Sequence, residues 1–201
     1  MCNHLDRNRL SVSGVLHDPA CSKLAGGFTE VECNFFLKIV TLNTNNYFEW
    51  GSGSTTRLAA RRARVVTSIE GSKEWVRHMQ KSTLPSNVRL RYVNIGPTRA
   101  FSTPVQFNTT LGRHYIRAID HVPPQDVVLV DGRWRVACAM RARNKLSANG
   151  MLLVHDFQRK EYQVLRSAFY IVERAGNLAA LRSLNATDNF STPYERIPLR
   201  Q

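Results

Sequence analysis

Residues 47–56 read Tyr47-Phe48-Glu49-Trp50-Gly51-Ser52-Gly53-Ser54-Thr55-Thr56, and an alanine-rich segment follows from Arg57. A short apolar run therefore ends in an acid, passes two glycines one residue apart and enters a segment of helical composition. A strand, a tight glycine turn and a helix start form a layout in which the backbone can approach a ligand closely. Because glycine turns also serve ordinary loops, the rest of the chain decides what this turn means.

The composition fits a single globular domain with an unusual charge. The chain has 201 residues, of which 43% are hydrophobic and 21% charged, and 28 Lys and Arg against 15 Asp and Glu give a net charge of +13. Such a field attracts polyanions and anionic substrates. The alternative is a solvated basic surface without a polyanion partner, because the arginines are spread along the chain and form no known RNA-binding motif.

Neither the cysteines nor the hydropathy indicates secretion or a membrane span. The cysteines at 2, 21, 33 and 138 are scattered without metal-ligand spacing, and we interpret them as reduced thiols. Residues 1–10 are charged and polar, and no apolar run approaches the ~18 residues that a membrane span needs. We therefore expect a cytoplasmic protein.

From about residue 30 onward, helical and strand patterns alternate along the chain. The predicted helices span about 30–41, 54–62, 72–80, 114–119, 133–145 and 159–167, the first opened by a Thr29–Glu32 capping box. The predicted strands span about 46–50, 64–70, 88–95, 126–131 and 151–156, and a hairpin of 169–173 with 178–181 follows. Residues 97–114 predict a long polar loop of the kind that often forms lids or binding loops. This alternation indicates an α/β fold with a mostly parallel, doubly wound sheet.

Four of the predicted strands end in an acid. These residues are Glu49, Glu70, Asp131 and Asp156. In doubly wound sheets, ligands bind at the carboxyl ends of the strands, near the point where the strand order switches. The four acids are therefore candidates for one site.

With the glycine turn, these acids resemble those of class I S-adenosylmethionine-dependent methyltransferases, in particular small methyltransferase-like proteins. The matching segments are Glu49 to Thr56, Glu70, Gly96-Pro97-Thr98 and Val130-Asp131-Gly132-Arg133-Trp134-Arg135-Val136-Ala137. The resemblance implies a single Rossmann-like domain over residues 29–184, with a mostly parallel seven-stranded sheet, helices on both faces and a C-terminal antiparallel hairpin. An irregular lead-in at 1–28 and a polar tail at 185–201 flank this domain.

The resemblance also implies S-adenosyl-L-methionine as the cofactor. The residues implied to contact it are Glu49, Gly51, Ser52, Gly53, Ser54, Thr55 and Glu70. The glycines would let the backbone pass close to the methionine part, and Glu49 would attract the ammonium group or order the turn. Glu70 would accept both ribose hydroxyls; helix capping is the alternative role for such an acid.

The acceptor is not identified by the sequence. The implied catalytic residues are Asp131, His155 and Asp156, and the implied substrate-binding residues are Thr98, Arg133 and Arg135. Either arginine could clamp an anionic acceptor, and two arginines two positions apart cannot share one helical face. A structural hydrogen bond is the alternative for His155, and we expect Trp75 and Trp134 to pack between helix and sheet.

Departures from family patterns restrict the chemistry. Asp131-Gly132-Arg133-Trp134 stands where base and glutamine N-methyltransferases carry an Asp/Asn-Pro-Pro-aromatic motif, which disfavours such N-methylation. Phe157 replaces the asparagine of metal-dependent O-methyltransferases, so we expect no metal. Thr55 stands where the fuller cofactor motif has its last glycine. One rival function is a dinucleotide enzyme, which Thr56 disfavours by replacing the third glycine of Gly-x-Gly-x-x-Gly. The other is a basic nucleic-acid- or anion-binding protein on a catalytically inactive methyltransferase fold, which the net charge favours.

Overall fold

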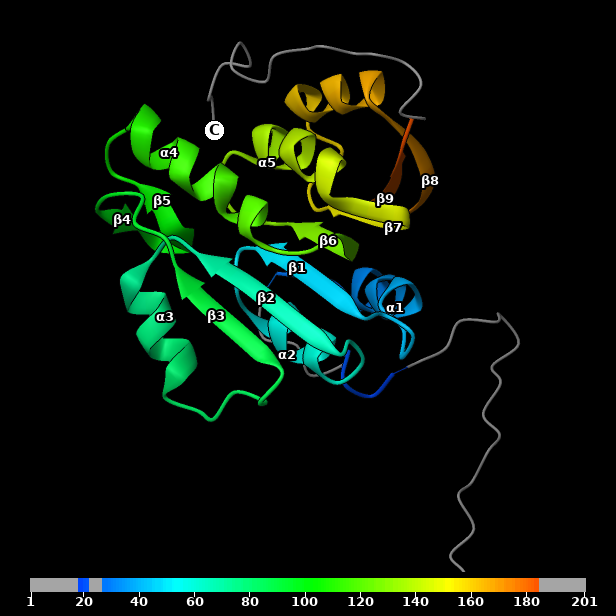
Figure 1. The fold of residues 1–201 in the computed structure, drawn as a ribbon, viewed down its shortest axis with the longest axis horizontal. Helices are drawn as coiled ribbons and strands as arrows, with labels where there is room; N and C mark the ends of the chain where they lie inside the picture. Colours follow the sequence, from blue (N-terminus) through cyan, green and yellow to red (C-terminus); the bar gives the residue numbers. More distant parts are fainter. Residues whose placement is uncertain (1–17, 22–26, 185–201) are drawn as a thin grey trace, which may run out of the picture.

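The computed structural model describes residues 18–21 and 27–184, which fold around a central seven-stranded sheet (Figure 1). The strand order is β3-β2-β1-β6-β7-β9-β8, parallel from β3 to β7, with β9 antiparallel to both β7 and β8. The strands are β1 (Asn46–Trp50), β2 (Val65–Glu70), β3 (Val88–Tyr92), β6 (Gln125–Val130), β7 (Leu146–Val154), β8 (Phe169–Ala175) and β9 (Leu178–Ser183). The predicted mostly parallel sheet with a closing hairpin is confirmed.

Helices cover both faces of this sheet. Those that share a core with one face are α1 (Glu30–Ile39) and α2 (Ser54–Ala60), and those on the other are α4 (Thr109–Ile116) and α5 (Arg135–Ala142). Helix α3 (Lys73–Gln80) packs along β2 and β3. The 3-10 turns are η1 (Ala100–Ser102), η2 (Arg117–His121), η3 (Arg143–Lys145) and η4 (Lys160–Ser167). No helix in the described part of the chain is long and apolar enough to cross a membrane.

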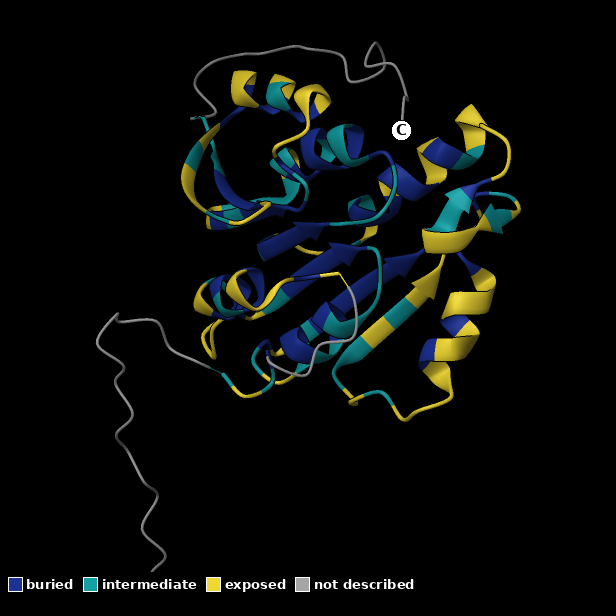
Figure 2. Ribbon diagram, turned by 180° about the vertical axis from the view of Figure 1, so that it is seen from behind, coloured by how far each residue is buried: buried dark blue, intermediate teal, exposed yellow. Residues whose placement is uncertain are grey.

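Strand β1 lies inside the sheet, between β2 and β6, and is buried on both faces. Tyr47 faces the core shared with α1 and α2, whereas Phe48 and Trp50 face the core shared with α4 and α5, as the period of two in a strand requires. The Trp50 indole N–H donates to the carbonyl of Tyr115, 2.9 Å away, at the end of α4. Figure 2 shows the central strands buried and the edge strand β3 largely exposed.

The strand order switches between β1 and β6, which are neighbours in the sheet. From β1 the chain proceeds through α2 to β2 on one side, and from β6 it proceeds through α5 to β7 on the other. The two connections therefore diverge to opposite sides of the sheet at the carboxyl ends of β1 and β6, which is where doubly wound sheets bind their ligands. This edge of the sheet carries the glycine turn, Glu70, Asp131 and His155.

Several element boundaries differ from the sequence prediction. Helix α4 starts at Thr109 rather than 114, because the Asn108 side chain caps it by accepting from the Leu111 N–H at 3.0 Å. Before it, β4 (Thr98–Arg99) and β5 (Thr103–Pro104) pair as a short hairpin within the predicted loop. Strand β7 begins at Leu146, ahead of an irregularity in its pairing with β6.

The segment after β7 is a 3-10 helix, η4, and not the α-helix predicted at 159–167. Its buried residues Tyr162 and Leu165 are three positions apart, which matches three residues per turn as well as it matches an α-helix. Hydrophobic spacing over so short a segment does not distinguish a 3-10 helix from an α-helix.

The prediction that the cysteines are reduced thiols is wrong for one pair, because Cys21 and Cys33 form a disulfide. The turn that carries Cys21 contacts α1 and the segment that follows α2: the Asp18 N–H donates to the Asn34 side chain at 3.1 Å, and the Asp18 carboxylate pairs with Arg62 at 3.0 Å. These tertiary contacts bring together two cysteines whose 12-residue spacing carries no signal. Cys138 is buried and free. Cys2, most of the predicted lead-in and the predicted tail lie outside the described residues.

Candidate functional site

The glycine turn after β1 touches the turn after β6 through backbone atoms. Gly51 has φ +95°, and a Cβ there would lie 2.9 Å from the carbonyl carbon of Asp131 and from the nitrogen of Gly132. At Gly53, by contrast, a Cβ would meet nothing within 4 Å. Packing within the protein therefore explains the glycine at 51, whereas the side of the turn at Gly53 is open. Ser54 begins α2 directly after it.

Glu49 is fully buried beneath the turn. Its carboxylate accepts hydrogen bonds from Tyr47 at 2.8 Å, Thr55 at 2.9 Å and Ser68 at 2.7 Å, and also from Thr56. Burial raises the pKa of Glu49 to about 7, although the four hydroxyls partly offset this effect. Of the two roles expected for Glu49, these contacts support the ordering of the turn, and they also occupy the Thr55 hydroxyl.

Glu70 ends β2 with a carboxylate surrounded by serines. Its Oε2 accepts from the N–H of Ser52 at 3.1 Å and from the Ser52 hydroxyl at 2.9 Å. Its Oε1 accepts from the N–H of Ser72 at 2.8 Å and from the Ser102 hydroxyl at 2.5 Å. The three serines come from the glycine turn, the N-cap of α3 and the tip of the β4–β5 hairpin. The carboxylate thus lies where hydroxyl groups converge, and a ligand's hydroxyls could take the place of serine hydroxyls.

The two tryptophans in question differ in environment. Trp134 is buried against Tyr115, with ring centroids 5.5 Å apart, as expected for a packing residue. Trp75 is 40% exposed, and its indole N–H donates to the carbonyl of Ser52 at 2.8 Å. Trp75 therefore lies against the outer side of the glycine turn, stacked on His78, and the expectation that it packs between helix and sheet is wrong.

Arg135 joins the ends of β6 and β7. Its guanidinium contacts the carboxylates of Asp131 at 2.9 Å and Asp156 at 3.0 Å, and it donates to the carbonyls of Asp131, Gly132 and His155. The side chain is 10% exposed. All three guanidinium nitrogens are engaged inside the protein, so Arg135 acts as a structural clamp on the two strand-end acids.

His155 lies between two carboxylates. Its Nδ1 is 2.9 Å from Oδ1 of Asp131, its Nε2 is 3.7 Å from Oε2 of Glu32, and its ring packs on Phe28. Burial alone would lower the pKa of His155, but the hydrogen bond and negative charge of Asp131, together with the charge of Asp156, raise it overall. Both ring nitrogens therefore face acids, and the arrangement favours an imidazolium.

Glu32 is a residue of this site that the sequence indicated only as part of a capping box. The capping box with Thr29 is confirmed, and the same carboxylate accepts from the Asn177 N–H at 2.7 Å. Burial opposes ionisation, but these hydrogen bonds and the charge of His155 lower the pKa of Glu32. Glu32 comes from α1 and Asn177 from the β8–β9 turn, so no local pattern could have placed them beside His155.

Arg133 differs from Arg135 in having an unsatisfied donor. Its Nε is buried and has no hydrogen-bond partner among residues 18–21 and 27–184. Burial, together with the positive charge of Arg135, lowers the pKa of Arg133. Thr98 is half-buried at the base of the β4–β5 hairpin, paired in register with Pro104. Within the described ranges, no group of three or more His, Cys, Asp and Glu side chains could hold a metal ion.

No family model matches the chain, and no curated protein matches it in sequence. Solved structures do share its fold. A methyltransferase-like protein from Silicibacter pomeroyi is 27% identical, with a TM-score of 0.66 over 78% of this chain and 89% of that one.

Two further solved structures are more distant. A precorrin-6y C5,15-methyltransferase from Geobacter metallireducens is 14% identical, with a TM-score of 0.51 over 80% of this chain and 92% of that one. A precorrin 8w decarboxylase from Methanobacterium thermoautotrophicum is 17% identical, with the same TM-score and coverage. The prediction of a Rossmann-like methyltransferase fold is confirmed.

Proposed function

We propose that this protein is an S-adenosylmethionine-dependent methyltransferase that acts on an anionic acceptor. The proposal rests on the environment of Glu70. Its carboxylate is buried at the end of a strand, next to a glycine turn, and already accepts hydrogen bonds from hydroxyl groups. The 27% identity with the S. pomeroyi methyltransferase-like protein supports this class of function.

The residues of the turn fit the proposed cofactor. Glu70 would accept the two ribose hydroxyls, and the open side of Gly53 would admit the methionine part without a Cβ in the way. Ser52 and Ser54 flank this open side. Ser54 would offer its N–H and hydroxyl to the methionine carboxylate, whereas both donors of Ser52 are on Glu70, and its hydroxyl would be released when a ribose hydroxyl takes its place there. Bound S-adenosylmethionine supplies a methyl group on an electrophilic sulfonium, so the protein needs chiefly to align an acceptor with it.

An anionic acceptor fits the distribution of charge at the end of β6. Arg133 has a buried nitrogen without a partner, whereas Arg135 is fully engaged with Asp131 and Asp156. We therefore assign acceptor binding to Arg133, and Thr98 of β4 remains a second candidate for it. Arg135 and Asp156 would position Asp131 and hold the strand ends together.

The contacts of His155 bear on the choice of base. Both of its ring nitrogens face carboxylates, so neither is free to remove a proton from the acceptor. Asp131 binds His155 and Arg135 through Oδ1, and its Oδ2 would be the basic atom nearest the acceptor. An acceptor that arrives as an anion needs little or no deprotonation, which is consistent with so restrained a histidine.

A thermal shift measurement tests the cofactor class. S-adenosylhomocysteine should raise the melting temperature by an amount that grows with the ratio of its concentration to its dissociation constant, while NAD should have little effect. The absence of a shift at millimolar S-adenosylhomocysteine would contradict the proposal. The acceptor can then be sought by transfer of a tritiated methyl group into fractions of cell extract.

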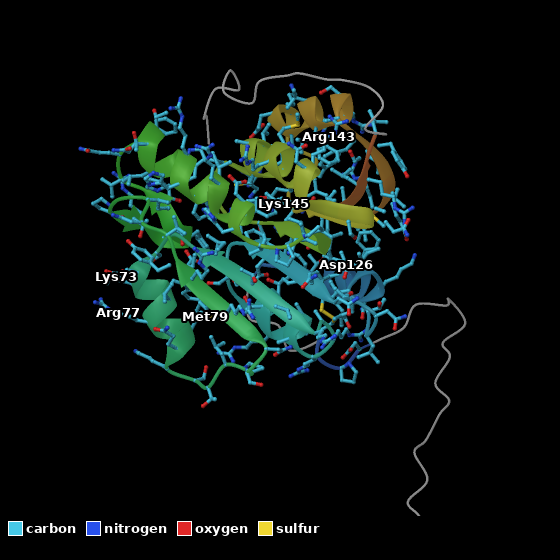
Figure 3. The ribbon with its side chains drawn as sticks, in the orientation of Figure 1. Lys73, Arg77, Met79, Asp126, Arg143 and Lys145 are labelled. Carbon is cyan, nitrogen blue, oxygen red and sulfur yellow. A yellow bond between two sulfur atoms is a disulfide. The ribbon has the colours of Figure 1, made fainter. Side chains whose placement is uncertain are left out.

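A second candidate function is nucleic-acid binding along α3 and β3. Residues 57–99 contain ten Lys and Arg against two Asp and Glu, which is eight of the thirteen net positive charges. Lys73 and Arg77 are one turn apart on the outer side of α3 (Figure 3), Lys81 follows at the same spacing, and the edge strand β3 exposes Arg89 and Arg91. This asymmetry is the observation that favours a polyanion partner.

Salt dependence tests the second candidate. Binding of a single-stranded RNA to Lys73→Gln/Arg77→Gln should be weaker than to wild type and should show a smaller salt slope. The matched control is Lys160→Gln/Arg166→Gln, which removes the same charge from exposed positions in η4. Equal losses in the two double variants would indicate a nonspecific charge effect and would contradict a site on α3.

A further inference from the structure

The hairpin of β4 and β5 bends its tip onto Glu70. Thr98 pairs with Pro104 and Arg99 with Thr103, and the N–H of Val105 donates to the carbonyl of Pro97 at 2.8 Å. The hairpin spans residues 98–104, and at its tip the Ser102 hydroxyl donates to Oε1 of Glu70 at 2.5 Å. A segment that the sequence predicted as a binding loop therefore contacts the acid at the end of β2.

The carboxylate of Glu70 has no acceptor capacity to spare. It receives two backbone N–H groups, from Ser52 and Ser72, and two hydroxyls, from Ser52 and Ser102. A carboxylate offers about four lone-pair sites, so these donors fill it. The backbone donors are fixed by the glycine turn and the start of α3. Two incoming ribose hydroxyls would therefore have to replace the two serine hydroxyls.

The tip holds a backbone conformation that its residues disfavour. Phe101 has φ +56° and Ser102 φ +55°, two consecutive non-glycine residues in the left-handed region. Such residues persist only where other contacts hold them. The Phe101 side chain is 89% exposed and contributes little packing, which makes the hydrogen bond to Glu70 the evident contact that holds the tip down.

We propose that Ser102 occupies the place of the cofactor ribose on Glu70, and that the hairpin 98–104 is an internal competitor that the cofactor displaces. The inference rests on the proposed function, because it takes the ribose as the ligand of Glu70. The apparent affinity for the cofactor is the intrinsic affinity multiplied by the fraction of molecules whose site is open. Loss of the Ser102 hydroxyl should enlarge that fraction, and the strained backbone at 101–102 should then relax away from Glu70.

Binding of S-adenosylhomocysteine to Ser102→Ala, measured by calorimetry and stopped flow, tests the proposal. The variant should bind about tenfold more tightly than wild type, as expected for loss of one competing hydrogen bond to a charged group, and it should associate faster. The matched control is Thr103→Ala on the same hairpin, whose register partner is Arg99 and not Glu70. Its affinity should equal that of wild type.

The possible results separate this inference from the proposed function. If wild type binds and Ser102→Ala binds equally well, the hairpin does not compete. If Ser102→Ala binds more weakly, Ser102 holds the ligand rather than opposing it, and the proposal is wrong. If neither protein binds S-adenosylhomocysteine, the proposed function fails and this inference fails with it. Tighter binding by Ser102→Ala together with an unchanged Thr103→Ala would establish the competition.

Discussion

Gly51 and Gly132 lie back to back where the strand order of the sheet switches. A Cβ on Gly51 would lie 2.9 Å from the nitrogen of Gly132, and a Cβ on Gly132 would lie 3.0 Å from the nitrogen of Gly51. The turns after β1 and β6 therefore touch through their backbones, with no room for a side chain between them. This contact fixes the glycine turn against the end of β6.

Alanine substitutions at the two glycines of the turn should have different consequences. Gly51→Ala places a Cβ against the backbone of Gly132 at φ +95°, and it should cost on the order of 2–4 kcal/mol of unfolding free energy in urea. Gly53→Ala meets no atom within 4 Å and should change stability by less than about 1 kcal/mol. If the open side is the cofactor's, Gly53→Ala should nonetheless weaken S-adenosylhomocysteine binding. Equal destabilisation by both changes would contradict the account.

Glu49 should make the protein less stable as the pH rises from acid to neutral. The unfolded chain ionises this carboxyl near the ordinary glutamate pKa of 4.5, whereas the folded protein keeps it protonated up to a pKa of about 7. The contribution of this group to the free energy of unfolding is therefore full below pH 4.5 and falls between pH 4.5 and 7. It does not change further above pH 7, and the total loss is on the order of 3 kcal/mol. Glu49→Gln should remove this slope, and exposed Glu173→Gln should retain it, in urea unfolding at pH 5 and pH 8. The same slope in wild type and Glu49→Gln would show that Glu49 is not responsible.

His155 should titrate above its usual range. Asp131, Asp156 and Glu32 face it and favour the imidazolium, whereas Arg135 and burial oppose it. Because the folded-state pKa is raised, the stabilisation is full below pH 6.5 and is lost as the pH rises through the folded pKa. The ring-proton NMR shift of His155 should give a raised pKa that falls in Asp131→Asn, and falls less in Glu32→Gln because that contact is longer. A pKa at or below 6.5 in wild type would refute this arrangement.

Substitutions at Arg133 and Arg135 should affect different properties, acceptor binding in the first case and folding stability in the second. Arg135→Gln leaves Asp131 and Asp156 without their shared cation and should cost about 3 kcal/mol of unfolding free energy. Arg133→Gln removes a cation whose Nε has no partner in the described part of the chain, so stability should change by less than about 0.5 kcal/mol. Once an acceptor is known, Arg133→Gln should raise its KM with little change in kcat. A large loss of stability in Arg133→Gln would assign that residue a structural role.

The strand-end acids show what the sequence can and cannot place. Apolar runs, the glycine turn and the hairpin signal predicted the sheet, because burial and turn chemistry are local properties. The direction in which each acidic side chain points depends on its position in the strand. Glu49 is the last residue but one of β1 and shares the face of Tyr47, whereas Glu70 is the last residue of β2. A strict count of alternation would have placed Glu49 inside the protein.

Other features of the site depend on contacts between distant segments. Ser102 meets Glu70 across 32 residues of sequence, and Glu32 reaches His155 from the first helix of the domain. The Cys21–Cys33 disulfide likewise depends on the packing of a short turn against α1. Residue type and spacing identify such groups as candidates, but the fold decides which of them meet.

Calorimetric titration with S-adenosylhomocysteine decides whether Glu70 accepts the hydroxyls of the cofactor ribose. Wild type and Glu74→Gln, an exposed charge change on α3, should bind the ligand equally, and Glu70→Gln should bind it at least about tenfold more weakly because a charged acceptor of two hydroxyls is lost. The absence of binding to wild type, or unchanged binding to Glu70→Gln, would contradict the assignment of Glu70 as the ribose acceptor.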